Sequence, residues 1–275
     1  MFEFCDVYKA FLNEALFTKE ILGLGINQIR KANYATKGIY YEAFVCLSTG
    51  LERIGKLCLI LDYYINSNGA LPNLKYIKKG IGHDLVKLYK KSEEISKIHK
   101  INFRFHFDHN EEIYKRILVI LSQFAMGDRY SNIDVLSKEI KQSDSMTLWH
   151  NNVDSFIYEH YVSDKKKIQI DDNAELINAM VGDLMLVQHI SENGKTISNV
   201  KTASKMTGVQ EAIAPYRQLF VLQIIRYWSE LIIGLGHIAQ SVNIKELEIP
   251  YFSEVFGGFC NNDSYFKSRK TWDKI

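Results

Sequence analysis

The sequence has few prolines and almost no net charge. Three prolines occur among its 275 residues, where average usage would give roughly four times as many. Because a many-stranded sheet needs frequent turns, this scarcity favours helices. Thirty-four Lys and Arg residues stand against 32 Asp and Glu residues, a net charge of +2. The whole chain is therefore not a polycation, and attraction to nucleic acid has to come from local clusters.

Cysteine is also scarce. Cys5, Cys46, Cys58 and Cys260 lie far apart, without a C-x-x-C spacing. We therefore expect neither a disulfide framework nor a structural zinc site. The first residues lack the basic segment of a signal peptide, so we predict a cytoplasmic protein.

The most apolar stretch, Leu219–Ala239, is long enough to cross a bilayer, but it contains Arg226 and Glu230. Charges are costly in a membrane core, and these two can pair because they are four residues apart on a helix. We predict a buried core helix and no membrane partner.

The first half of the chain has the apolar spacing of helices. We expect a first helix from about Phe4 to Arg30 and a second from Tyr40 to Ile65, which ends before Asn66-Ser-Asn-Gly69. A third begins near Gly82, and a fourth covers about Asn110–Phe124. Residues 1–142 therefore predict a helical bundle.

The second half is less regular. Residues 143–172 are polar and predict a linker or surface excursion, in which Ile168-Gln-Ile170 resembles a short strand. Helices are expected over about Asn173–His189, then briefly near Ile197–Lys205, then from about Pro215 to Ser241. The aromatic tail after Pro250 should dock on the bundle. The predicted fold is all-α, a helical bundle extended by a second helical region over residues 173–275.

One short segment carries candidate catalytic residues. Arg104-Phe-His-Phe-Asp-His109 has two histidines and an aspartate, but their spacing does not put all three on one helical face, so no metal is expected. Arg104 and His109 can instead meet near a helix start. Arginine stabilises charge on a phosphate, and histidine transfers a proton, which suits metal-free RNA cleavage without a cofactor. The alternative is an exposed polar cap.

A basic stretch follows the second helix. Between Lys75 and Lys100 there are eight lysines and three acidic residues. A basic patch of this kind can face RNA, although a solvated helix face has the same pattern. The nucleic-acid-binding candidates are Lys78, Lys79, His83, Lys87 and Arg129.

Residues from Tyr40 to about Asp134 resemble the HEPN superfamily of prokaryotic helical bundles. The resemblance rests on Glu52-Arg-Ile-Gly-Lys56 in the second helix and on Gly82-His-Asp-Leu-x-x-Leu88 at the start of the third. It covers about a third of the chain. It implies a bundle that often dimerises, in which an Arg-x4–6-His pair from each subunit forms a metal-independent ribonuclease site. Arg104 and His109 have that spacing, and Phe105 stands where the family usually has a polar residue.

Two classes of function follow from these features. The first is a HEPN-like protein of a toxin–antitoxin or anti-phage defence system, a homodimeric endoribonuclease acting through Arg104 and His109. The second is a non-catalytic helical adaptor, or a nucleic-acid sensor, that binds a protein partner from the same operon.

Overall fold

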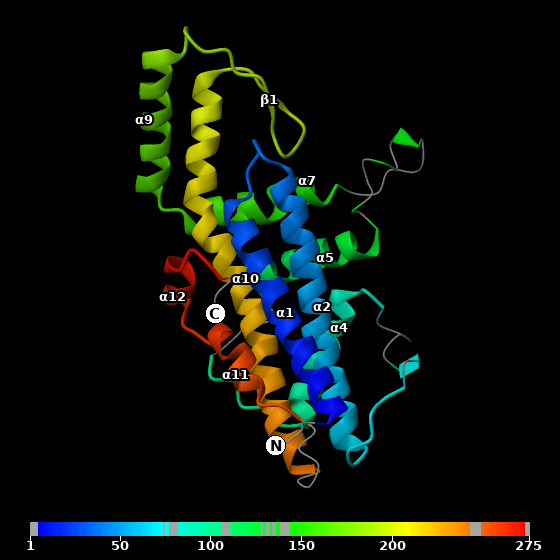
Figure 1. Cartoon of the computed structure of the whole chain (residues 1–275). Coiled ribbons are helices and arrows are strands. Elements are labelled where there is room, and N and C mark those ends of the chain that lie inside the picture. Colours follow the sequence, from blue (N-terminus) through cyan, green and yellow to red (C-terminus); the bar gives the residue numbers. More distant parts are fainter. Residues whose placement is uncertain are drawn as a thin grey trace.

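Helices make up nearly all of the regular structure in the described part of the chain (Figure 1). The computed structural model describes residues 5–73, 75–76, 82–105, 111–127, 129, 133, 136–137, 144–242 and 249–272. The elements in order are α1 (Asp6–Lys31), α2 (Gly38–Asn66), α4 (Leu85–Ile98), α5 (Glu112–Met126), α7 (Ser145–Trp149), the π-helix η2 (His150–Asp154), α8 (Ser155–Tyr161), α9 (Asp164–Val181), β1 (His189–Ile190), β2 (Thr196–Ile197), α10 (Val200–Val242), α11 (Phe252–Phe256), the 3-10 helix η3 (Gly257–Phe259) and α12 (Asp263–Ser268). The all-α prediction is confirmed.

Helices α1 and α2 pack closely because small residues face large ones across their contact. A Cβ atom added to Gly50 of α2 would lie 2.6 Å from Cδ2 of Leu22. In the same way, a Cβ on Gly25 of α1 would lie 2.8 Å from Cδ2 of Leu47. Each leucine therefore occupies the space that the opposing glycine leaves open, and the two helix axes come together.

The second helix has the bounds that its apolar spacing predicts. It ends where Asn68 and Gly69 adopt positive φ angles of 50° and 92°, a left-handed conformation that asparagine and glycine tolerate. The amide of Gly69 bonds to the carbonyl of Tyr64 at 2.9 Å and closes the helix end. The stop predicted at this position is confirmed.

The expected linker over residues 143–172 is wrong for its described part. This segment forms α7, η2, α8 and the start of α9, and Ile168 and Ile170 belong to α9 rather than to a strand. Trp149, Val153 and Ile157 are all fully buried. Their spacing of four puts them on one helical face, and burial of that face stabilises the segment despite its polar composition.

The helices predicted near Ile197–Lys205 and from about Pro215 to Ser241 are parts of one helix, α10. Helix α10 runs unbroken through Pro215, so this proline does not lie in a first turn. Proline removes one backbone hydrogen bond, but Ile213 and Arg217 on both sides of it are fully buried and hold the helix in place. The helix predicted for Asn173–His189 also differs, because α9 ends at Val181 and His189 pairs with Ile197 in the hairpin.

Helix α10 is long and apolar enough to cross a membrane, but 83% of its most apolar window is buried inside the protein. The predicted core helix is therefore observed. Arg226 forms its ion pair with Asp263, at 2.9 Å between Nη1 and Oδ1.

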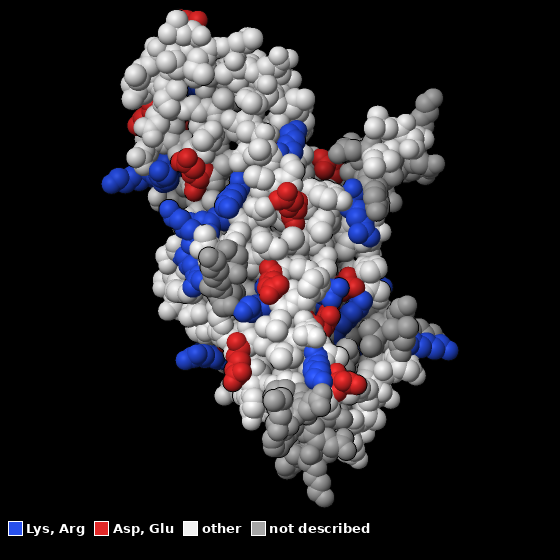
Figure 2. All heavy atoms as spheres, in the orientation of Figure 1, with Lys and Arg blue, Asp and Glu red and all other residues white. Residues whose placement is uncertain are grey.

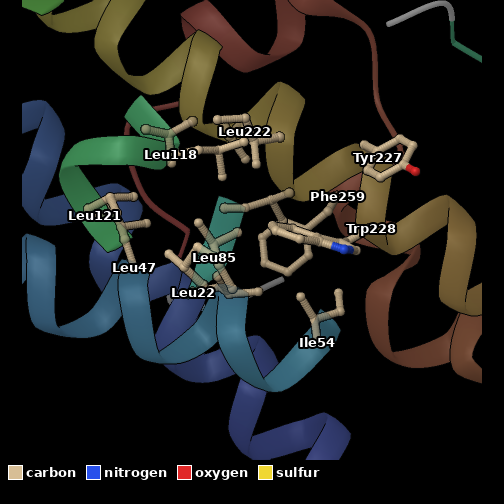
Figure 3. Close-up of a cluster of buried hydrophobic side chains, with 14 of the residues drawn as sticks. Leu22, Leu47, Ile54, Leu85, Leu118, Leu121, Leu222, Tyr227, Trp228 and Phe259 are labelled. Carbon is tan, nitrogen blue, oxygen red and sulfur yellow. The ribbon is translucent and has the colours of Figure 1, made fainter. Parts of the chain in front are cut away.

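A single hydrophobic core joins the first and second halves of the chain (Figure 3). It contains Leu22 of α1, Leu47 of α2, Leu85 of α4, Leu121 of α5, Trp228 of α10 and Phe259 of η3. The aromatic tail docks as predicted, with Trp272 buried and stacked on Phe259 at 6.2 Å between ring centroids. Beyond this core, α9 and the first half of α10 project together at one end of the molecule (Figure 1).

Candidate functional site

The predicted basic face has acidic partners. His83 Nδ1 lies 2.8 Å from Glu52 Oε2, and Lys56 Nζ lies 2.5 Å from the other oxygen of the same carboxylate. Lys87 Nζ is 3.3 Å from Asp84. These basic side chains already have carboxylate partners, which weakens their attraction for phosphate. Lys78 and Lys79 lie outside the described residues.

Asp84 is the N-cap of α4, as its place before the third helix predicts. Its carboxylate accepts a hydrogen bond from the amide of Lys87 at 3.0 Å. Partial burial alone would raise the pKa of Asp84, but the hydrogen bonds and the Lys87 charge outweigh it and lower the pKa. The Gly82-His83-Asp84 motif therefore serves to start a helix and to join it to α2 through Glu52.

Arg104 lies on the surface beside the second half of α10. Its backbone amide donates to Glu230 Oε2 at 2.9 Å, and the Phe105 amide donates to the same oxygen at 3.5 Å. The Arg226 guanidinium lies 4.4 Å from the Phe105 ring centre. Burial raises the pKa of Glu230, although the two amides and both arginines oppose that shift. His109 lies outside the described residues, so its distance from Arg104 stays a prediction.

Arg129 belongs to a different group of residues. It lines a cavity of about 250 Å³ together with Lys37, Tyr40, Tyr41 and Asp144. Of the predicted nucleic-acid-binding residues, His83 pairs with Glu52 and Lys87 with Asp84, whereas Arg129 lines a cavity at the start of α2.

A buried polar network was missed by the sequence reasoning. Its centre is Arg217 of α10, which is fully buried. Arg217 Nε and Nη2 donate to the two oxygens of Asp154 at 2.6 and 2.5 Å, and Nη2 also donates to Tyr40 OH at 2.8 Å. Burial alone would lower the pKa of Arg217, but the Asp154 charge reverses this and raises it above its ordinary value. For Tyr40, in contrast, burial itself raises the pKa.

The turn between β1 and β2 adds a second carboxylate to this network. Glu192 is buried, and its Oε1 accepts from Gln210 Nε2 at 2.7 Å and from Tyr40 OH at 3.3 Å. Its Oε2 has no hydrogen-bond partner among the described residues and lies 3.8 Å from His150 Nδ1. His150 Nδ1 is also 4.0 Å from Asp154 Oδ2, so one imidazole nitrogen faces two carboxylates.

The location of His150 explains why this network was missed. His150 and Asp154 are the two ends of η2, in the segment predicted to be a linker. π-helices are rare and occur frequently at functional sites. The four-residue spacing of Trp149, Val153 and Ile157 was the available signal for a helix here.

Two further observations bear on function. Among the residues that the structure describes, no group of three or more His, Cys, Asp or Glu side chains is arranged to hold a metal ion. Comparison of the chain with protein-family models, with curated proteins and with solved structures finds no match.

Proposed function

We propose that this chain is a helical interaction protein that assembles through the projecting end of α9. The observation that carries the proposal is a set of apolar side chains exposed to solvent, which we name the arm tip. Their exposed fractions range from 42% to 94%. The set consists of Leu176, Ile177, Met180, Leu184, Met185 and Leu186.

The arm tip is about as large as the largest apolar patch on a typical monomer, and such a patch is often functional. Added together, its exposed fractions correspond to about four fully exposed side chains. Burying one such side chain is worth about 1.5–3 kcal/mol, and at about 25 cal/mol per Å² four of them correspond to about 250–500 Å² of apolar surface. A monomer seldom exposes contiguous apolar patches beyond a few hundred Å². A standard interface buries about 800 Å² per partner, and about 65% of it is apolar in homodimers. The arm tip therefore supplies half or more of the apolar area that one side of a homodimer needs.

The charges of this region favour a second copy of the chain as the occupant. Residues 176–190 contain one charged side chain, Asp183, and on the face that Figure 2 shows, the far end of the molecule carries little blue or red. Such a surface lacks the cations that bind nucleic acid or an acidic partner, and it lacks the acids that bind a basic one. An apolar surface of similar size meets it when two arm tips pack together about a twofold axis.

The test is the mass of the chain in solution as a function of concentration. We expect the wild-type chain to reach twice the monomer mass in light scattering or sedimentation. The double variant Met180→Lys, Leu184→Lys should stay monomeric, because lysine would have to lose its hydration at the interface. Ile98→Lys is the matched control, since Ile98 is 64% exposed at the end of α4, outside the arm tip. A wild-type monomer at every concentration, or a dimer that both variants retain, would contradict self-association.

The endoribonuclease prediction is a second candidate, and one observation supports it. Arg104 is exposed, and Arg104 and Arg226 flank the ring of Phe105, at 5.8 and 4.4 Å from its centre. An exposed guanidinium group can contact a phosphate, and the aromatic ring beside it can stack on a base. We expect wild-type chain to cleave RNA in the presence of chelator, and Arg104→Ala and His109→Ala each to lose that activity. Equal cleavage by all three proteins, or none by the wild type, would rule this function out.

A further inference from the structure

The side of His150 away from Nδ1 opens on a cavity. The cavity has a volume of about 420 Å³ and lies between the β1–β2 hairpin and the first half of α10. His150 Nδ1 is buried, yet 21% of the His150 side chain is exposed. His150 is one of the residues that line the cavity.

The buried network behind His150 carries one uncompensated negative charge. Arg217 supplies one positive charge, and Asp154 and Glu192 supply two negative ones. In a low-dielectric interior an unpaired charge is costly. His150 Nδ1 lies 3.8 Å from Glu192 Oε2. The two carboxylates lie on the Nδ1 side of the imidazole, which leaves Nε2 for a ligand in the cavity.

The rest of the cavity wall is suited to an anion with an apolar body. Lys195, Lys201 and Lys205 line it, and its lining contains neither aspartate nor glutamate. Lys201 and Lys205 are paired with Glu175 and Asp171 of α9, which weakens their attraction for an anion. Lys195 has no ion pair among the described residues and is the lysine most open to an anion. The apolar part of the wall consists of Ile197, Met206 and Val209.

We propose that this cavity binds a small organic anion, a carboxylate or phosphate on an apolar body, with the His150 imidazolium as the group that contacts the anion. The volume lies in the range of small-molecule sites. Glu192 and Asp154 act as positioning residues, because their carboxylates face Nδ1 of the ring at 3.8 and 4.0 Å. This site is independent of the arm tip, and its ligand is recognised by charge and shape rather than by chain assembly.

The test uses four probes in calorimetric titrations of the full chain. Phenyl phosphate and benzoate carry the two anions on the same apolar ring, phenol is the neutral comparison, and inorganic phosphate has no apolar part. We expect phenyl phosphate or benzoate to bind more tightly than phenol and inorganic phosphate. The anion that binds more tightly identifies the ligand class. No binding of either aromatic anion, or binding of phenol as tight as that of the anions, overturns the proposal.

The variants locate the binding on the named residues. His150→Gln removes the charge and keeps a polar side chain, and it should weaken binding by about tenfold to a hundredfold. Lys195→Gln should weaken it less, and this residue is exposed, so folding is not at risk. Lys165→Gln is the matched control, because Lys165 is exposed on α9 and does not line the cavity. Unchanged affinity in both cavity variants, or an equal loss in the Lys165 control, also overturns the proposal.

Discussion

Asp154 and Glu192 are two buried carboxylates around one arginine, and their bonds predict different results when each is replaced by its amide. Asp154 accepts from two different nitrogens of Arg217, at 2.6 and 2.5 Å. Glu192 receives one short bond, from Gln210 at 2.7 Å. Its second oxygen has no hydrogen-bond partner among the described residues. Asp154→Asn and Glu192→Gln therefore remove the same charge from two different geometries.

The expected costs differ because Asp154 loses short, two-point pairing with Arg217, whereas the Glu192 oxygen that is replaced lies 3.8 Å from His150 Nδ1. In Asp154→Asn, the new NH₂ group faces an Arg217 N–H, and the fully buried guanidinium loses its paired charge. Breaking a buried ion pair costs about 3–5 kcal/mol. In Glu192→Gln, the amide oxygen still accepts from Gln210, and the NH₂ group takes the place of the oxygen near His150. We expect a smaller loss in the free energy of unfolding, about 1–2 kcal/mol.

Urea unfolding at neutral pH measures both changes. Circular dichroism and tryptophan fluorescence should give coincident transitions, so that one free energy describes each protein. Because Trp149 immediately precedes the π-helix, its fluorescence reports on this part of the fold. Equal destabilisation by the two amides, or a larger loss for Glu192→Gln, would refute the argument from bidentate pairing.

Three further predictions concern packing, capping and pH. Gly50→Ala should lower the free energy of unfolding by about 1–3 kcal/mol through overpacking against Leu22. Gly38→Ala is the control and should not lower it, because a Cβ atom there meets nothing within 4 Å. Urea unfolding of the two variants compares them. Asp84→Ala should lower the free energy of unfolding by about 1 kcal/mol in the same measurement, because α4 loses its N-cap. Asp84→Asn should keep most of the wild-type stability, since asparagine also caps a helix. Burial raises the pKa of Glu230, so the folded chain binds the carboxyl proton more tightly than the unfolded chain does. The folded state therefore loses stability as the pH rises through the raised pKa of Glu230. Glu230→Gln should therefore be more stable than wild type at neutral pH, with a gap that closes below about pH 4; a gap independent of pH would contradict this.

Most of the helices could be predicted from the sequence because their signals are local. The apolar spacing of Tyr40–Ile65 and the Asn-Gly stop after it determine α2, and α1, α4 and α5 follow in the same way within a few residues. The errors occurred where tertiary contacts outweigh local composition. The polar segment before α9 is helical because Trp149, Val153 and Ile157 have a core to pack against, and α10 continues through Pro215 for the same reason.

The candidate sites were harder to predict, since a site brings together residues that are far apart in the chain. His83, Arg104 and Arg129 were chosen from short motifs, and the structure gives His83 a carboxylate partner from another helix, Glu52. The Arg217 network unites residues from α2, η2, the β-turn and α10. No spacing within any one of these segments indicates the others.

The low proline content and the helical apolar periods were enough to determine an all-α chain with α2 and α10 at its centre. Hydrophobic periodicity is a property of each segment by itself, so it can be read without knowing what the segment packs against. Only the tertiary structure decided which charges are buried together, as with Asp154, Glu192 and Arg217, and which apolar side chains stay in solvent at the arm tip. Those outcomes depend on distances between segments, and a buried charge is tolerated only where another part of the chain supplies its partner.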